Sequence, residues 1–201
     1  MPDPILLVLQ TTAKMRNQTQ TTKSSSILTI VKYGDPILRK KVEDITDFTS
    51  LPDMTEEMFN TMYEENGIGL AANQVGWSLN LLILDTRNLE GEEDREPYIF
   101  INSKLIKTEG AIVLEEGCLS VPDIRADINR PETITLQYQD LDQNFHENTF
   151  KGIVSRVIQH ELDHLQGKFF IDYLPPAKKL LINKRLLEIA EKGRPSTGII
   201  L

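Results

Sequence analysis

The stretch RVIQHELDHLQG, from Arg156 to Gly167, places two histidines four residues apart, with a glutamate directly after the first. In a helix, positions four apart lie on one face, so His160 and His164 would direct their ring nitrogens at one point. This geometry supplies two ligands for a tetrahedral metal ion, and Glu161 would lie near enough to take a proton from water. The pattern therefore predicts a metal-binding helix over residues 152–166.

A metal site of this kind needs a third protein ligand, and the sequence offers two candidates. The extended pattern H-E-x-x-H-x-x-G-x-x-H fails here, because Phe170 stands at its third ligand position. Glu188, on a later predicted helix, would suit a zinc endopeptidase. Cys118 has acidic neighbours that make it a poor nucleophile, but a divalent metal ion deprotonates a coordinating thiol outright. The residue pattern alone leaves both ligands open.

The composition is that of an ordinary globular protein. The chain has 201 residues, of which 40% are hydrophobic and 26% charged, and this length suits one domain with a sizeable core. Its net charge of −8 argues against general binding of DNA or RNA, because phosphates repel an acidic surface. The single cysteine excludes a disulfide framework and favours a reducing compartment. We find no apolar run of the ~18 residues that a membrane span needs.

The chain divides into an extension, a core and a tail. Residues 1–26 are predicted to be a disordered N-terminal extension, because most of this segment is rich in Thr, Ser and Gln and lacks apolar periodicity. We expect a cytoplasmic protein, with an organellar location as the alternative if the extension is a transit peptide. Residues 27–193 are expected to form a single catalytic domain, followed by a tail at 194–201.

Apolar patterning predicts an α+β fold, because strands and helices do not alternate as βαβ units. We expect antiparallel or mixed strands packed around the central metal-binding helix, with a C-terminal helix at about 176–192. The predicted strands cover residues 79–85, 98–106, 111–117, 132–140 and 144–150, the last two as a hairpin, and a β-rich run begins at 27. A further helix is predicted over 51–66, with a methionine-rich core face.

The stretch GIGLAANQVG, from Gly67 to Gly76, imitates a dinucleotide-binding fingerprint. The context does not fit, because the preceding segment has helical periodicity and Gly76 would interrupt the helix that must follow. Glycines can instead let a backbone approach a substrate closely, and Gln74 would offer an amide donor there. We therefore interpret this stretch as a substrate loop.

Three motifs together resemble those of the peptide deformylase family. They are GIGLAANQVG (Gly67–Gly76), EGCLS (Glu116–Ser120) and QHELDH (Gln159–His164), in the family's order and at about its spacing. The resemblance covers roughly residues 27–180. It implies a metallohydrolase that removes the N-formyl group from the formyl-methionine of nascent proteins and releases formate.

The resemblance implies a role for each residue of the metal site. Cys118, His160 and His164 would bind one divalent metal ion, and Glu161 would act as general base and then as general acid. Thiolate and imidazole ligands suit zinc as well as iron. Family resemblance favours Fe²⁺, with Zn²⁺ or Ni²⁺ as substitutes.

The resemblance also implies how substrate is held. The side chain of Gln74 and the backbone N–H of Leu119 would face the oxyanion. Ile68 and Gly69 would hold the peptide backbone in extended form. An apolar pocket for the methionine side chain would be formed by Ile68, Leu114, Ile153 and Val157.

Four positions bear on how the site is supported. Glu116 and Arg125 resemble a structural ion pair beside the cysteine loop. Asn73 stands where the family usually has proline, which restores a backbone N–H and favours a more flexible loop. Arg156 stands where many members are apolar, and we expect it at the pocket rim or pointing to solvent.

Two functions other than deformylation are also considered, and the basic C-terminal segment suggests one partner. A zinc endopeptidase would use Glu188 in place of Cys118, and a catalytically silent metal-binding homologue would need neither Glu161 nor Gln74. From Gly167 onward the chain has seven Lys or Arg against three Asp or Glu. This basic C-terminal helix is interpreted either as an ordinary solvated docking helix or as a contact to ribosomal RNA. Its leucines and isoleucine at 180, 181, 186, 187 and 189 are expected to dock on the body.

Overall fold

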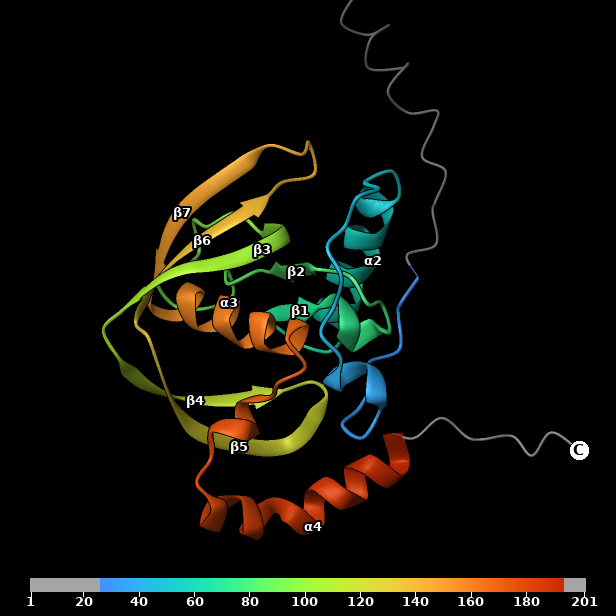
Figure 1. The fold of residues 1–201 in the computed structure, drawn as a ribbon, viewed down its shortest axis with the longest axis vertical. Helices are drawn as coiled ribbons and strands as arrows, with labels where there is room; N and C mark the ends of the chain where they lie inside the picture. The colour runs from blue at the N-terminus through green and yellow to red at the C-terminus, as the bar shows by residue number, and fades with distance from the viewer. Residues whose placement is uncertain (1–25, 194–201) are drawn as a thin grey trace, which may run out of the picture.

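The computed structural model describes residues 26–193, so the predicted extension up to residue 25 and the predicted tail at 194–201 lie outside the described residues. Figure 1 shows the elements in space. The helical elements are η1 (Pro36–Arg39), α2 (Leu51–Glu64), η2 (Ala72–Val75), α3 (Gly152–Leu165), η3 (Phe170–Tyr173) and α4 (Pro176–Gly193). The strands are β1 (Gly69–Ala71), β2 (Leu81–Leu84), β3 (Tyr98–Glu109), β4 (Ile112–Cys118), β5 (Val121–Arg130), β6 (Thr133–Gln139) and β7 (Phe145–Lys151).

The strands form one large and one small sheet. The large sheet has the order β1-β2-β3-β6-β7, and β4 pairs with β5 in a separate two-stranded sheet. Every pairing between these strands is antiparallel, which confirms the predicted α+β class. In Figure 1, α3 lies between the large sheet and the β4–β5 hairpin, as expected for a central helix.

The core explains why β2 is apolar at every position. Because successive strand residues point to opposite faces, Leu82 and Leu84 pack towards Val154 and Ile158 of α3. Leu81 and Ile83 pack on the other face with α2 and its methionines, which lie in the core as predicted. A strand covered on both faces needs no polar alternation. The large sheet is therefore a rigid layer between α2 and α3.

A third cluster joins the hairpin to the C-terminal helix. Val121, Ile124 and Ile128 of β5 pack with Phe169 and Phe170, and with Leu186 and Ile189 of α4. The expectation that all five apolar residues of this helix dock is wrong for three of them. Leu180, Leu181 and Leu187 are 76%, 84% and 57% exposed, because the buried face of α4 follows positions 182, 186, 189 and 190.

The predicted helices 51–66, 152–166 and 176–192 correspond to α2, α3 and α4 within about two residues, and all five predicted strands are present. Two strands have no counterpart in the sequence expectations. β1 is only three residues long, and β5 contains charged residues at its exposed positions. The β-rich run from 27 forms no strand, since its backbone is held by bonds such as Val31 N–H to the Gln74 carbonyl. No helix within residues 26–193 is long and apolar enough to cross a membrane.

Candidate metal centre and active site

Two elements far apart in sequence bring three sulfur and nitrogen ligands together. Cys118 ends β4, and His160 and His164 lie one turn apart on α3. One donor atom from each of the three lies within 4.8 Å of the others. The Cys118 Sγ and the His164 Nε2 are 3.1 Å apart. Glu188 takes no part, because its carboxylate lies on α4 and pairs with Arg185 at 3.2 Å.

The chemistry of this cluster fits a divalent metal ion. A thiol and two imidazoles that converge in a buried site have few good hydrogen bonds to offer one another, whereas a tetrahedral ion would satisfy all three. The His160 Nδ1 is already engaged at 2.8 Å by Glu116 Oε2, which leaves its Nε2 for a metal. Phe170, which replaces the third ligand of the extended histidine pattern, stacks on the His160 ring instead.

Glu116 is the partner that orients His160. Arg130 donates to it through Nε at 2.6 Å and through Nη2 at 3.0 Å, and Arg156 donates through Nη1 at 2.8 Å. Burial opposes the charge of Glu116, but the bonds from His160 and Arg130 outweigh it and hold the pKa of this carboxyl well below its usual range. The carboxylate is therefore a permanent acceptor for His160.

The expected ion pair between Glu116 and Arg125 is wrong. Arg125 lies 3.4 Å from Glu115, and both side chains are largely exposed. Strand alternation explains the difference, because Glu115 and Glu116 point to opposite faces of β4. The inward carboxylate of Glu116 meets the inward Arg130, five positions further along β5 than Arg125.

Glu161 lies buried between α3 and β1. A Cβ placed on Gly69 would come within 2.7 Å of the Glu161 Oε1, so only glycine allows this approach. The Oε2 atom is buried and has no hydrogen-bond partner among residues 26–193. Burial raises the pKa of Glu161 to about 7. A carboxyl with this pKa can both accept and release a proton near neutral pH.

The η2 loop contacts two of the three ligand residues. The Gln74 Oε1 accepts a bond from the Ala71 N–H at 2.8 Å, which turns the Nε2 towards Cys118 Sγ at 3.6 Å. The Asn73 Nδ2 donates to the His164 carbonyl at 2.6 Å, and Asn73 is fully buried. The Asn73 side chain therefore ties the loop to α3, a contact that opposes the flexibility expected from the missing proline ring.

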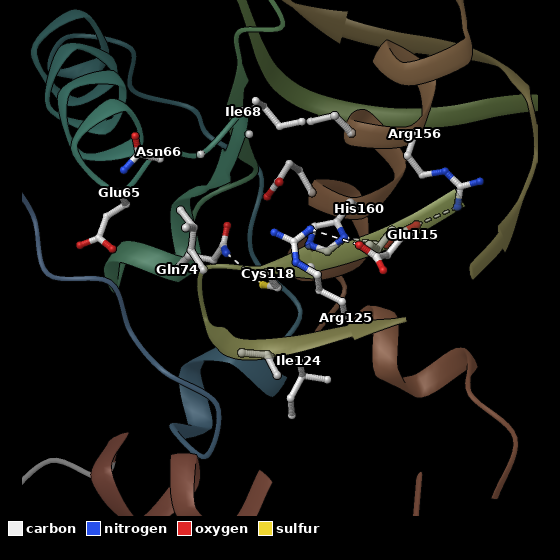
Figure 2. Close-up of a pocket in the computed structure, with 18 of the residues that line it drawn as sticks. Glu65, Asn66, Ile68, Gln74, Glu115, Cys118, Ile124, Arg125, Arg156 and His160 are labelled. Atoms are coloured by element: carbon white, nitrogen blue, oxygen red, sulfur yellow. Dashed lines mark hydrogen bonds and ion pairs between the residues drawn. The ribbon is translucent and has the colours of Figure 1, made fainter. Parts of the chain in front are cut away.

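A cavity of about 500 Å³ opens beside the cluster (Figure 2). Its lining includes residues expected to hold substrate, namely Ile68, Gly69, Gln74, Leu119, Ile153 and Val157. Leu114 is not in this lining. Figure 2 shows Cys118, His160 and Gln74 grouped together, with Arg156 on the far side from Gln74.

Arg156 was expected either at the pocket rim or pointing to solvent. It lines the cavity and does not point to solvent. Its side chain is only 4% exposed, and the guanidinium is turned into the protein. Besides Glu116, it bonds the Ile128 carbonyl at 2.8 Å and the Ile112 carbonyl at 2.5 Å. Sequence reasoning did not identify Arg130 as a support of the site. It placed Asn73 and Arg156 near the site but not their partners, because those partners lie on other elements.

A cluster of one half-buried cysteine and two buried histidines, with a glutamate beside it at the wall of a cavity in an α+β fold, defines a metal-dependent hydrolase. The sequence model described as polypeptide deformylase matches residues 27–180, so the chain belongs to the peptide deformylase family. The activity of this family is the metal-dependent removal of N-formyl groups from nascent polypeptides, and the chain is an enzyme of this class. Neither the endopeptidase nor the silent homologue is supported.

Individual relatives agree with the family match. The peptide deformylase of Flavobacterium johnsoniae is 41% identical over 177 residues, covering 82% of this chain and 90% of the relative. That of Chlorobaculum tepidum is 41% identical over 166 residues, covering 82% and 89%. Among solved structures, peptide deformylase from Plasmodium falciparum superposes with a TM-score of 0.77 at 36% identity, covering 85% of this chain and 99% of that one. The Thermus thermophilus enzyme has a TM-score of 0.77 at 34% identity, covering 84% and 100%.

Proposed function

We propose that Cys118, His160 and His164 hold one divalent metal ion, and that Glu161 is the general base and then the general acid of formyl hydrolysis. The observation that carries this proposal is the convergence of the three donor atoms within 4.8 Å, next to a buried glutamate with an unpartnered oxygen. We further propose that residues 27–193 form the whole catalytic domain.

The protein groups divide the chemical work. When bound, the metal ion would supply Lewis acidity, lowering the pKa of the attacking water and polarising the formyl carbonyl. Glu161 accepts the proton of the water as its oxygen adds to the formyl carbon. The Gln74 Nε2 and the Leu119 N–H donate hydrogen bonds to the oxyanion. Glu161 then gives the proton to the departing nitrogen as the C–N bond breaks, which yields formate and a free amine.

The cavity supports a methionine side chain next to an extended peptide. Ile68, Ile153 and Val157 supply an apolar wall. Within residues 26–193, the strand β1 pairs with β2 alone and is therefore an edge of the large sheet. A peptide can extend this edge through the backbone of Ile68 and Gly69. Leu114 is left out of the proposed pocket because it does not line the cavity.

The test is formate release from a formyl-Met tripeptide, with protein reconstituted anaerobically with Fe²⁺. Glu161→Gln should keep its metal, because the three ligands remain, and lose about 10²–10⁴-fold in kcat. Elemental analysis checks the metal content of the same sample. Loss of the metal in this variant would mean that Glu161 is structural.

The ligand set is tested by a matched pair of variants. Cys118→Ser should weaken metal binding strongly or change which metal binds, while Glu188→Ala should leave metal content and formate release unchanged. The reverse pattern would refute the assignment of Cys118.

We propose Fe²⁺ as the preferred ion, with Zn²⁺ or Ni²⁺ as substitutes. One thiolate and two imidazoles form a borderline ligand set that accepts all three. Protein purified without oxygen and loaded with each ion in turn should release formate fastest with Fe²⁺. Equal or greater turnover with Zn²⁺ would contradict this preference.

We also propose that the substrates are formyl-Met nascent peptides met at the ribosome, with α4 as the contact. Lys178 and Lys184 are exposed on α4, whereas the cation of Arg185 is paired with Asp123 and Glu188. The double variant Lys178→Gln, Lys184→Gln should weaken ribosome cosedimentation at low salt and reduce its salt dependence. Lys104→Gln, exposed on β3, is the control. Wild-type protein that never cosediments would leave α4 as a packing helix.

A further inference from the structure

Arg156 connects the two parts of the molecule that carry the metal ligands. It lies on α3 one turn before His160, and its guanidinium bonds three acceptors that all belong to the β4–β5 hairpin. The Ile112 carbonyl lies near the start of β4, the Glu116 carboxylate near its end, and the Ile128 carbonyl on β5. This side chain therefore links the hairpin of Cys118 to the helix of the two histidines at three points.

The charge of Arg156 belongs to a set of four charged groups whose side chains are between 4% and 13% exposed. Arg130 and Arg156 are both bonded to Glu116, and Arg130 also donates to Asp163 at 2.6 Å. Two cations thus face two carboxylates. Loss of Arg156 would leave one negative charge of this set uncompensated beside a Glu116 side chain that is only 4% exposed, where an unpaired charge is costly.

Arg156 also shares in holding the Glu116 carboxylate that serves His160. The Oε1 atom accepts from Arg156 Nη1 and Arg130 Nε, while Oε2 accepts from Arg130 Nη2 and His160 Nδ1. With both oxygens engaged by two donors each, the carboxylate cannot rotate. The His160 ring, bonded to Oε2, is held in one orientation.

We propose that Arg156 is a positioning residue of the metal site, which fixes His160 through Glu116 and fixes the Cys118 hairpin relative to α3. This inference rests on the proposed ligand role of Cys118, His160 and His164. Arg156 touches neither the proposed ligands' donor atoms nor the reacting groups. It acts only through the residues that it holds.

The inference is tested with Arg156→Met, which keeps the length of the side chain but removes its charge and donors. Arg156→Lys keeps the charge but cannot reach all three acceptors. Arg95→Met is the matched control, because Arg95 is exposed in a surface pair with Glu92. Each protein is loaded with Co²⁺ to record its thiolate charge-transfer and ligand-field bands. Each is also loaded with Zn²⁺ to measure the rate of release to an excess of chelator.

Arg156→Met should release Zn²⁺ about 10- to 100-fold faster than wild type, with shifted Co²⁺ bands. Arg156→Lys should change in the same direction by less, and Arg95→Met should match wild type. A residue that only stabilised the fold would lower the apo melting temperature and leave the bands and the release rate unchanged at a temperature well below melting. That result would overturn the inference.

If Arg156→Met does not fold, Arg156→Lys decides: wild-type bands and release in that variant would overturn the inference. The test also separates this inference from the ligand assignment. Wild-type protein without a Co²⁺–thiolate band would overturn both together. A wild-type band with unchanged release in the folded Arg156 variants would overturn only the role of Arg156.

Discussion

Burial is what raises the pKa of Glu161. Its carboxylate lies against the bare backbone of Gly69. One of its oxygens, Oε2, has no hydrogen-bond partner among the described residues. The same carboxylate on a surface helix would be ionised at neutral pH and useless as an acid. At the scale of one residue, the missing Cβ of Gly69 is what allows the proposed proton carrier to sit at the cavity wall.

The raised pKa of Glu161 predicts a pH dependence of stability in metal-free protein. Burial raises this pKa from its ordinary 4.5 to about 7, so the folded state binds the proton more tightly than the unfolded state. The stabilisation is fully present below about pH 4.5 and is lost as the pH rises through about 7. Urea unfolding in EDTA should therefore show wild-type stability falling between pH 5 and pH 8.

Glu161→Gln provides the comparison, because its side chain stays neutral at every pH. The loss of stability between pH 5 and pH 8 should be smaller in this variant, by on the order of 3 kcal/mol. An identical pH dependence in the two proteins would show that the folded carboxyl titrates at its ordinary value.

At the scale of elements, η2 joins α3 to the end of β4. Its consecutive residues Asn73 and Gln74 direct side-chain amides at His164 and Cys118, which come from opposite sides of the site. The His164 carbonyl lies in the last turn of α3 and also accepts from the Gly167 N–H at 3.0 Å. The short loop thus holds two ligand-bearing elements together through adjacent positions.

This arrangement predicts a clear cost for Asn73→Ala. The substitution removes the 2.6 Å bond to the buried His164 carbonyl, and should lower the free energy of unfolding by about 1–3 kcal/mol. Urea denaturation of metal-free protein measures this change without the metal's contribution. Asn88→Ala, at an exposed loop position, should stay within about 0.5 kcal/mol of wild type. Equal stability of both variants would mean that the Asn73 bond is not formed in solution.

Across the whole molecule, the proposed metal ion would bridge the β4–β5 hairpin and the helix α3, which packs on the large sheet. Cys118 belongs to the β4–β5 pair, whereas α3 packs on the large sheet. A ligand that binds only the folded state stabilises it, by about 2.7 kcal/mol when present at 100 times its Kd. The large sheet has its own core on both faces, so it depends less on this bridge than the hairpin does.

Removal of the metal should therefore loosen the molecule unevenly. Chelation is expected to lower the melting temperature, and to speed amide hydrogen exchange in β4 and β5 while β2 and β3 stay protected. In Cys118→Ser, the chelator should change the melting temperature and the hydrogen exchange little, because this variant lacks the proposed metal ligand on the hairpin. Uniform acceleration of exchange across both sheets would contradict this picture.

The sequence by itself was enough to predict those site residues whose placement depends on local periodicity. The spacing of His160 and His164 predicted their shared face, since helical geometry repeats every few residues whatever surrounds it. The motif around Cys118, compared with the family, predicted the third ligand that its spacing had left open. Glu161 and Gln74 were expected at the site for the same reasons, and both line its cavity.

Only the tertiary structure decided which residues support these groups. Glu116 is bonded to Arg130 and Arg156 instead of Arg125, and Asn73 is tethered to a carbonyl 91 positions away. Likewise, Leu181 is exposed although it belongs to an apolar pattern. The physical reason is that ion pairs, tethers and buried helix faces depend on how β4, β5, α3 and α4 pack. Contacts between elements so distant in sequence leave no repeating pattern in the sequence from which they could be predicted.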